Sequence, residues 1–134
     1  MGESGSDRDI RVLVVDDHPL VRTTLAELLA EEADLTVVGE CDDGSQVVEA
    51  TARLRPDVVC MDVSMPVMDG LTAAGALRAA RSDVRIILFT SGPADHPVVA
   101  AAGADALVPK TARPDALLQC LRAVAAGADC PYCL

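Results

Sequence analysis

Long hydrophobic runs and positive charge are both scarce in this sequence of 134 residues. No stretch of about eighteen consecutive apolar residues occurs, so the sequence predicts no membrane-spanning helix. The polar, Gly/Ser-rich start from Met1 to Asp9 lacks the apolar core of a signal peptide, and we therefore expect a cytoplasmic protein. With a formal net charge of −10, the chain lacks the clustered cations that displace counterions from nucleic acid or anionic lipid. We expect no direct binding to nucleic acid or membrane.

Several common catalytic motifs are also missing. No Gly-x-x-x-x-Gly-Lys-Ser/Thr loop and no Gly-x-Gly-x-x-Gly turn is present, which excludes the usual cradles for nucleoside triphosphates and dinucleotides. No serine elbow or Cys/His pair stands at the end of a predicted strand. The remaining candidate nucleophile is an aspartate, and carboxylates do form aspartyl-phosphate intermediates.

Short apolar runs alternate with helical patterns along most of the chain. The apolar, largely β-branched runs predict buried strands over residues 11–15, 35–41, 57–61, 85–90 and 106–109. Helices are predicted from Pro19 to Leu29 and over residues 45–54, 71–80, 97–102 and 115–126.

This alternation predicts an α/β fold, a doubly wound five-stranded parallel sheet with helices on both faces. Pro109 cannot donate to a strand ladder, so the last strand should be an edge, as it is in the order 2-1-3-4-5.

Residues that can do chemistry follow four of these strands. Asp16 and Asp17 follow the first strand, Asp62 the third, Thr90 ends the fourth, and Lys110 follows the fifth. The carboxyl ends of parallel strands lie at one edge of the sheet, so these side chains should converge there. Crowded carboxylates are costly unless a hard cation joins them, and Mg²⁺ suits few carboxylates, carbonyls and waters. Each residue alone has an ordinary structural role; together they predict a site.

The same residues resemble the pattern of response-regulator receiver domains of bacterial two-component systems. The likeness rests, in order, on Val15-Asp16-Asp17-His18, Met61-Asp62-Val-Ser-Met-Pro-Val-Met-Asp-Gly70, Thr90 and Lys110. Gly103-Ala-Asp105 and the stretch from Leu117 to Gly127 resemble the NarL/FixJ-type subfamily. The resemblance implies a flavodoxin-like receiver domain over residues 10–127, a flexible segment over 1–9 and a tail over 128–134.

A phosphorylation-dependent switch is the function that this resemblance implies. Asp62 would be the phosphoacceptor and would attack the phosphohistidine of a sensor histidine kinase. Asp17, Asp62 and the backbone carbonyl of Ser64 would ligate Mg²⁺, and Asp16 would hold a metal-bound water. Lys110 and Thr90 would bind the phosphoryl group, the first by its charge and the second by a hydrogen bond.

The resemblance also implies partners and an output surface. The fourth helix, fifth strand and fifth helix would change on phosphorylation and control an output domain or partner. That partner would be a second copy of the chain or, in a longer parent chain, a LuxR-type DNA-binding domain. The protein would not be an enzyme acting on a separate substrate, because it would stop at one phosphoryl group and hydrolyse it slowly.

Two alternatives stay open at this point. A phosphatase or phosphotransferase of the haloacid-dehalogenase type would also use Asp62 as its nucleophile, but those enzymes place a second aspartate where Ser64 stands here. A pseudo-receiver would keep the fold and signal without phosphate. Retention of Asp16, Asp17, Asp62, Thr90 and Lys110 argues against it, whereas the changes on the output face keep it open.

These changes are departures from the family pattern. Leu107 stands where such receivers place an aromatic residue, three positions before the lysine. Pro93 and Pro97 delay the fourth helix, which we expect to span only about two turns, from Pro97 to Ala102. Pro66 and Gly70 should shape the loop after the third strand, and Asp69 should cap the helix that follows.

The cysteines fall into two groups. Cys41, Cys60 and Cys120 lie in apolar or helical patterns and read as small core residues. Cys130-Pro-Tyr-Cys133 has the letters of a glutaredoxin active site, but there the motif follows a strand and opens a helix, which lowers the pKa of the thiol. Near the end of this sequence we expect a frayed tail with two exposed thiols, and a redox or metal role is the minor alternative.

Overall fold

The computed structural model describes residues 9–65, 67–80, 82–92 and 96–134. Pro66 and Pro93 lie outside the described residues, as does the predicted N-terminal segment apart from Asp9. The carboxylate of Asp9 accepts a hydrogen bond of 2.6 Å from the hydroxyl of Thr36. No helix in these ranges has the length and apolar character that crossing a membrane requires.

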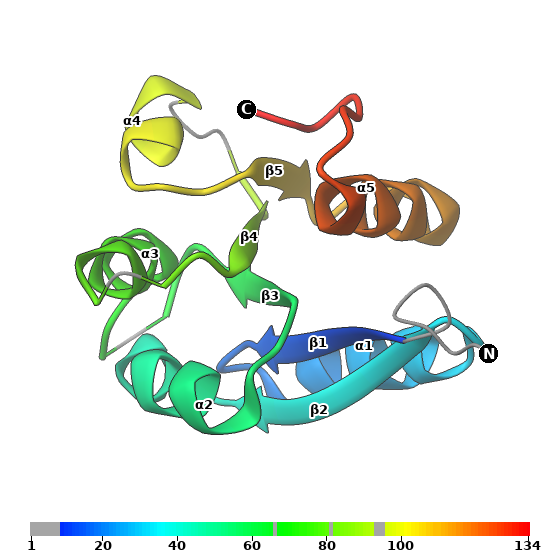
Figure 1. Ribbon diagram of the computed structural model, residues 1–134, viewed down its shortest axis with the longest axis horizontal. Coiled ribbons are helices and arrows are strands. Elements are labelled where there is room, and N and C mark those ends of the chain that lie inside the picture. Colours follow the sequence, from blue (N-terminus) through cyan, green and yellow to red (C-terminus); the bar gives the residue numbers. More distant parts are fainter. Residues whose placement is uncertain (1–8, 66, 81, 93–95) are drawn as a thin grey trace, which may run out of the picture.

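The described residues form one parallel sheet in the predicted order, β2-β1-β3-β4-β5 (Figure 1). Its strands are β1 (Ile10–Val15), β2 (Leu35–Cys41), β3 (Val58–Asp62), β4 (Arg85–Thr90) and β5 (Ala106–Pro109). β5 lies at an edge, as Pro109 requires. β3 begins and ends one residue later than predicted, so Asp62 is its last residue.

Helices cover both faces of this sheet (Figure 1). One face carries α1 (Pro19–Ala30) and α5 (Pro114–Ala126). The other face carries α2 (Val47–Leu54), α3 (Gly70–Ala79) and α4 (His96–Ala101).

Four helices differ from the prediction at their starts. α3 and α5 each begin one residue earlier, at Gly70 and Pro114, and α2 and α4 differ for reasons that the structure shows. The predicted helix over 45–54 is divided, because the side chain of Asp43 accepts a hydrogen bond from the amide of Ser45 and begins a 3₁₀ turn, η2 (Gly44–Gln46), ahead of α2. α4 begins and ends one residue earlier than predicted, because Pro97 is tolerated in a first turn, where its N–H would have no partner.

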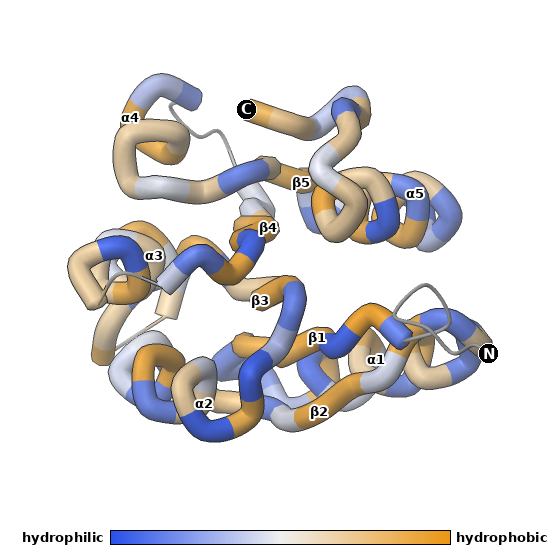
Figure 2. Tube along the Cα trace, viewed as in Figure 1, coloured by the Kyte–Doolittle hydropathy of each residue, from blue (hydrophilic) through white to orange (hydrophobic). Residues whose placement is uncertain are grey.

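Strand side chains alternate between two hydrophobic cores. Leu13 of β1 and Met61 of β3 pack under α2, α3 and α4, whereas Val14 and Cys60 pack under α1 and α5. β4 divides its side chains in the same way. Figure 2 shows hydrophobic residues along these central strands. The sheet is therefore buried on both faces, and polar chemistry is left to its edges.

The C-terminal tail is ordered against the free edge of β5, so the predicted frayed tail with exposed thiols is wrong. Cys133 forms an antiparallel bridge with Ala106. The amide of Leu107 donates to the carbonyl of Tyr132 at 3.0 Å, and the amide of Leu134 donates to that of Asp105 at 3.0 Å. An edge strand presents unpaired N–H and C=O groups, and here the tail pairs with them.

Candidate functional site

The three aspartates predicted as metal ligands meet at the carboxyl edge of the sheet. β1 and β3 pair with Val15 opposite Met61, so the residues that follow, Asp16 and Asp62, come level with one another. One oxygen from each of Asp16, Asp17 and Asp62 lies within 4.8 Å of the other two. Asp16 and Asp62 are only 4% and 6% exposed, which makes the repulsion between their charges costly.

Lys110 reaches this cluster from the end of β5. Its Nζ lies 3.0 Å from Oδ2 of Asp62 and 3.5 Å from Oδ2 of Asp16. Burial alone would lower the pKa of Lys110, but the hydrogen bond to Asp62 and the charges of both aspartates outweigh it and raise the pKa. Lys110 is therefore a cation at neutral pH.

The balance of charge in the cluster fits a divalent metal ion. Three carboxylates and one ammonium leave two uncompensated negative charges among these four side chains. The donors are all hard oxygens, and Asp17 is half-buried, so the cluster is open to water on its side. Mg²⁺ prefers such a set, since it binds through a few carboxylates and retains waters.

Both buried aspartates are oriented in the same way. Oδ1 of Asp16 accepts from the amide of His18 at 2.9 Å, and Oδ1 of Asp62 accepts from the amide of Ser64 at 3.1 Å. Each is a bond to the backbone two residues on, as in an Asx turn. In both residues Oδ2 faces Lys110. The carboxylates are thus held in place by the protein itself, and the backbone of Ser64 lies beside Asp62.

Thr90 reaches the site with its backbone, whereas its hydroxyl is engaged elsewhere. Its carbonyl accepts a hydrogen bond from the amide of Lys110 at 2.7 Å. Its hydroxyl donates to the carbonyl of Gly92 at 2.8 Å and accepts from the amide of Gly92 at 3.2 Å. Contact between this hydroxyl and a ligand on Asp62 therefore requires the Thr90 side chain to leave the Gly92 turn.

Gly70 fixes the return of the loop that follows Asp62. Its amide donates to the carbonyl of Val63 at 2.8 Å, and a Cβ at this position would collide with the backbone carbonyl of Asp62. Only glycine fits so close an approach. Asp69 caps α3, as predicted, by accepting a hydrogen bond of 2.8 Å from the amide of Thr72.

An apolar groove beside the cluster was missed by reasoning from sequence. A cavity of about 440 Å³ lies between α1 and α5, and Asp16 and Lys110 form part of its wall. Leu20 also lines it, although this side chain is 75% exposed. The available signal was Leu20 itself, an apolar residue outside the buried stripe of α1.

A family model and the curated relatives indicate the same protein family. The family model described as the response regulator receiver domain matches residues 12–122. The nitrate/nitrite response regulator protein NarL of Escherichia coli K12 is 38% identical over 118 residues, which cover 87% of this chain and 55% of that protein. The transcriptional regulatory protein LiaR of Bacillus subtilis is 40% identical over 120 residues, 88% of this chain and 57% of that protein. The chain spans about half the length of these curated relatives.

A solved structure agrees over almost its whole length. The signal receiver domain of the response regulator NarL from Mycobacterium tuberculosis superposes with a TM-score of 0.77 at 31% identity, covering 86% of this chain and 98% of that one. The region matched by the family model contains most of β1, the whole of the other four strands and every residue of the acidic cluster. This chain therefore belongs to the receiver domains of two-component response regulators, and within them to the NarL/FixJ type.

Proposed function

We propose that Asp62 accepts a phosphoryl group from a sensor histidine kinase in a step that requires Mg²⁺. The observation that supports this best is the setting of the Asp62 carboxylate. One oxygen is held by an amide and the other by the only lysine of the chain, inside a cluster with excess negative charge. A carboxylate fixed in this way is suited to attack phosphorus and form an aspartyl phosphate.

The residues that would hold Mg²⁺ are Asp17, Asp62 and the backbone carbonyl of Ser64, with Asp16 binding a water of the ion. Bound there, the ion would offset the charge of the phosphoryl oxygens as they approach the carboxylates. The uncompensated charge of the cluster supports this assignment, because it is the charge that a divalent cation would balance.

In the transfer step an oxygen of Asp62 forms a bond to phosphorus while the bond from phosphorus to the donor nitrogen breaks. The product carries roughly one more negative charge than the carboxylate it replaces. Lys110, protonated and already 3.0 Å from Asp62, would pair with the new phosphoryl oxygens. The hydroxyl of Thr90 would leave Gly92 and donate to one of them.

We expect the phosphoryl group to remain on the protein, with no turnover on a separate substrate. Ser64 stands two residues after the nucleophile, where haloacid-dehalogenase-like enzymes have a second aspartate. A serine there offers no carboxylate for general acid–base work, so release should be a slow self-hydrolysis.

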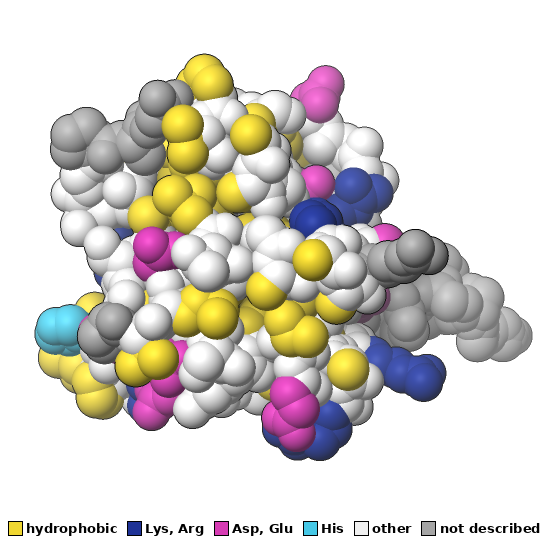
Figure 3. All heavy atoms as spheres, turned by 90° about the vertical axis from the view of Figure 1, so that its left-hand side faces the viewer, with side chains coloured by type: hydrophobic (Ala, Val, Ile, Leu, Met, Phe, Trp, Pro, Cys, Tyr) yellow, Lys and Arg dark blue, Asp and Glu magenta, His cyan; other side chains and the backbone are white. Residues whose placement is uncertain are grey.

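The receiver unit in this proposal covers residues 10–127, and two of its surfaces would meet partners. The groove between α1 and α5 opens beside Asp16 and Lys110, where a kinase must bring its phosphohistidine. The α4-β5-α5 face would carry the output to a second copy or to a LuxR-type DNA-binding domain of a longer parent chain. Figure 3 shows hydrophobic side chains gathered over α4, where Val98 is 50% exposed.

Acetyl phosphate tests the proposal without any kinase. With Mg²⁺ present, intact-mass measurement should show one added phosphoryl group on the wild type. Removal of Mg²⁺ with a chelator, or the Asp62→Asn substitution, should abolish it, while circular dichroism shows that the variant is folded. Undiminished labelling of the Asp62→Asn variant would refute the assignment.

A further inference from the structure

Three cysteines meet where the tail packs on α5, far along the chain from the aspartates. The sulfur of Cys130 lies 2.8 Å from that of Cys133 and 3.1 Å from that of Cys120. All three are free thiols. Cys120 is buried in α5, whereas Cys130 and Cys133 are half-buried and open to solvent on one side.

The local structure of the tail brings Cys130 and Cys133 together. The amide of Cys133 donates to the carbonyl of Cys130 at 3.1 Å, which closes a turn with Pro131 in its second position, the position that proline favours. The amide of Cys130 donates to the sulfur of Cys133 at 3.2 Å. The residues at the ends of such a turn have Cα atoms less than about 7 Å apart, a separation that a disulfide also spans.

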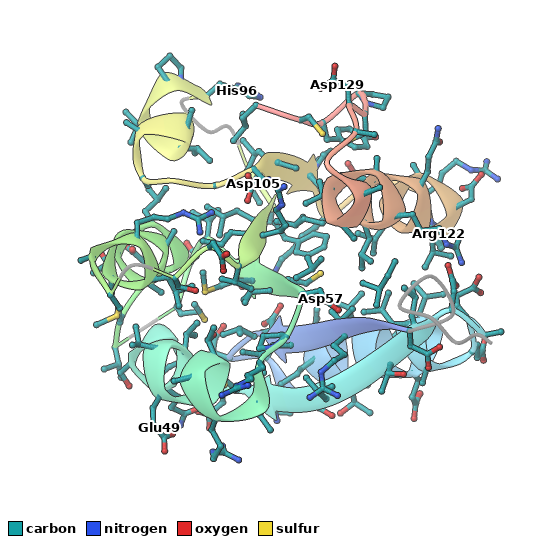
Figure 4. The ribbon with its side chains drawn as sticks, in the orientation of Figure 1. Glu49, Asp57, His96, Asp105, Arg122 and Asp129 are labelled. Carbon is teal, nitrogen blue, oxygen red and sulfur yellow. The ribbon has the colours of Figure 1, made fainter. Side chains whose placement is uncertain are left out.

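The turn is held in place by the rest of the domain. Its last residues pair with the edge of β5 through the bridge between Cys133 and Ala106 and the bond from Leu107 to Tyr132. Figure 4 labels Asp129 at the bend where the chain leaves α5 and turns back toward β5. The two sulfurs are therefore kept close by a docked backbone and do not depend on a chance encounter of a loose tail.

We propose that Cys130 and Cys133 are a redox-active dithiol that is oxidised to a reversible disulfide by a low-molecular-weight disulfide, with Cys130 attacking and Cys133 resolving. The Cys130 thiolate attacks one sulfur of the external disulfide and expels the other as a thiolate. That thiolate takes the proton of Cys133, whose sulfur then attacks Cys130 and expels the second external thiolate, which is protonated from water. The two protein thiols lose two electrons, and the external disulfide becomes two thiols.

The environment of each sulfur agrees with these roles. Burial alone would raise the pKa of Cys130, but hydrogen bonds with Cys133 and Cys120 and with backbone amides outweigh it and lower the pKa. Burial and the thiol of Cys130 raise the pKa of Cys133 to about 11. Burial likewise raises the pKa of Cys120. Cys130 is thus the thiol best able to attack, and Cys133 is the more accessible of its two neighbours.

Closing this bond would fix the turn that covers the edge of β5. The amide of Leu107, which donates to Tyr132, lies directly under that cover. Oxidation should therefore reduce the local opening of the tail and slow hydrogen exchange at the Leu107 amide severalfold. This consequence does not depend on phosphorylation of Asp62.

The test uses the whole chain incubated with glutathione disulfide, then denatured, alkylated and weighed. Wild type should lose two of its five alkylatable thiols, regain them with dithiothreitol, and yield a Cys130–Cys133 peptide. Cys133→Ser should stop at a mixed disulfide on Cys130, and Cys130→Ser should form neither product. Cys120→Ala is the matched control and should behave as wild type.

Other outcomes would overturn the proposal. A wild type that keeps all its thiols, or accumulates only mixed disulfides, would show that the pair is not redox-active. A bond between Cys120 and Cys130 would refute the resolving role of Cys133. Unchanged exchange at the Leu107 amide after oxidation would show that the bond does not fix the tail.

Discussion

The side chains of Asp16, Asp17 and Asp62 share one small volume, and Lys110 compensates only one of their charges. Two of the carboxylates are buried, where repulsion between like charges is least screened. Two backbone amides and the ammonium of Lys110 orient the carboxylates of Asp16 and Asp62. They do not balance all of the negative charge, so electrostatic repulsion between the carboxylates remains when no ligand is bound. A cation bound between these side chains would relieve this repulsion.

Mg²⁺ should therefore stabilise the folded protein before any phosphate is present. At a Mg²⁺ concentration about 100 times Kd, binding to the folded state alone contributes about 2.7 kcal/mol to the free energy of unfolding. Thermal melts with and without Mg²⁺ should show a higher Tm with the ion. The gain should vanish in the Asp17→Asn/Asp62→Asn double variant; an unchanged gain there would place the metal elsewhere.

The positions of these residues could be predicted from sequence, but one side-chain orientation could not. Asp16, Asp62 and Lys110 stand at the carboxyl ends of predicted strands. In a parallel sheet these ends lie on the same side, so the three residues were expected to meet. The Thr90 hydroxyl was predicted to face the site, but in the structure it bonds to the backbone of Gly92. The residue type of Thr90 does not determine which staggered rotamer its side chain adopts, so this orientation could not be predicted.

Among the elements, α3 and the start of β5 are joined by one arginine. The guanidinium of Arg78 donates to the carbonyls of Gly103 at 2.7 Å and Val84 at 2.7 Å, and to the carboxylate of Asp105 at 3.2 Å. Figure 4 labels Asp105 at the beginning of β5. Gly103 adopts a positive φ of 101° and packs against the Arg78 stem, so the turn after α4 depends on this side chain.

Arg78→Met should keep the packing of the stem but lose these bonds. Hydrogen bonds to charged groups contribute about 1.5 to 3 kcal/mol, so we expect a loss of about 2 kcal/mol in the free energy of unfolding. Urea denaturation measures it. Arg53→Met is a suitable control, since Arg53 is 63% exposed and pairs with Glu49 at a distance of 4.0 Å; it should change stability very little. Equal effects of the two substitutions would contradict this account of Arg78.

The fifth strand has a residue that limits how the output face can respond. Leu107 stands where the resemblance to receiver domains implies an aromatic residue. It is only 5% exposed and is packed in the core that also contains Val99 of α4. A side chain that is already buried cannot transfer further apolar area inward, and leucine has no hydroxyl to exchange a hydrogen bond. Shifting a two-state equilibrium from mostly off to mostly on takes on the order of 5 kcal/mol, so a smaller coupling leaves a mixture.

We therefore expect phosphorylation to shift this domain incompletely. NMR of the Mg²⁺ form with beryllofluoride, a phosphoryl mimic, should show averaged peaks for α4 and the end of β4 in the wild type. The same peaks should move further in the Leu107→Tyr variant, which restores an aromatic ring and a hydroxyl. A fully shifted wild type that the substitution leaves unchanged would show that the face switches by another route.

The hydrophobic pattern of the sequence predicted the strands but not the docking of the C-terminal tail on β5. The strands follow from apolar runs, and β2, β4 and β5 match their predicted ranges. The tail pairs with β5 and the residue before it through the backbone groups of Tyr132 and Leu134. Every residue carries such groups, so the residue types of the tail do not predict this pairing. The split start of α2 likewise depends on one side-chain bond, from the amide of Ser45 to Asp43.

In the whole molecule, the acidic cluster and the three cysteines lie toward opposite ends of the parallel strands. The acidic cluster lies at the carboxyl ends of β1 and β3, whereas the cysteines lie where the tail pairs with Ala106, the first residue of β5. The cysteines pack against the core under α1 and α5 and share no side-chain contact with the acidic cluster among the described residues, so we expect that the two groups can be altered independently. Phosphorylation should thus survive the Cys130→Ser substitution, and thiol oxidation should survive Asp62→Asn.

We propose that the phosphoryl group resides on Asp62, and reductive trapping can locate it on the chain. Borohydride reduces an acyl phosphate to an alcohol, so the phosphorylated aspartate becomes homoserine, which peptide mass mapping locates. After treatment with acetyl phosphate and Mg²⁺, we expect homoserine at position 62, while Asp16 and Asp17 remain unmodified. Homoserine at position 16 or 17, or at no position in a protein whose mass shows phosphorylation, would contradict it.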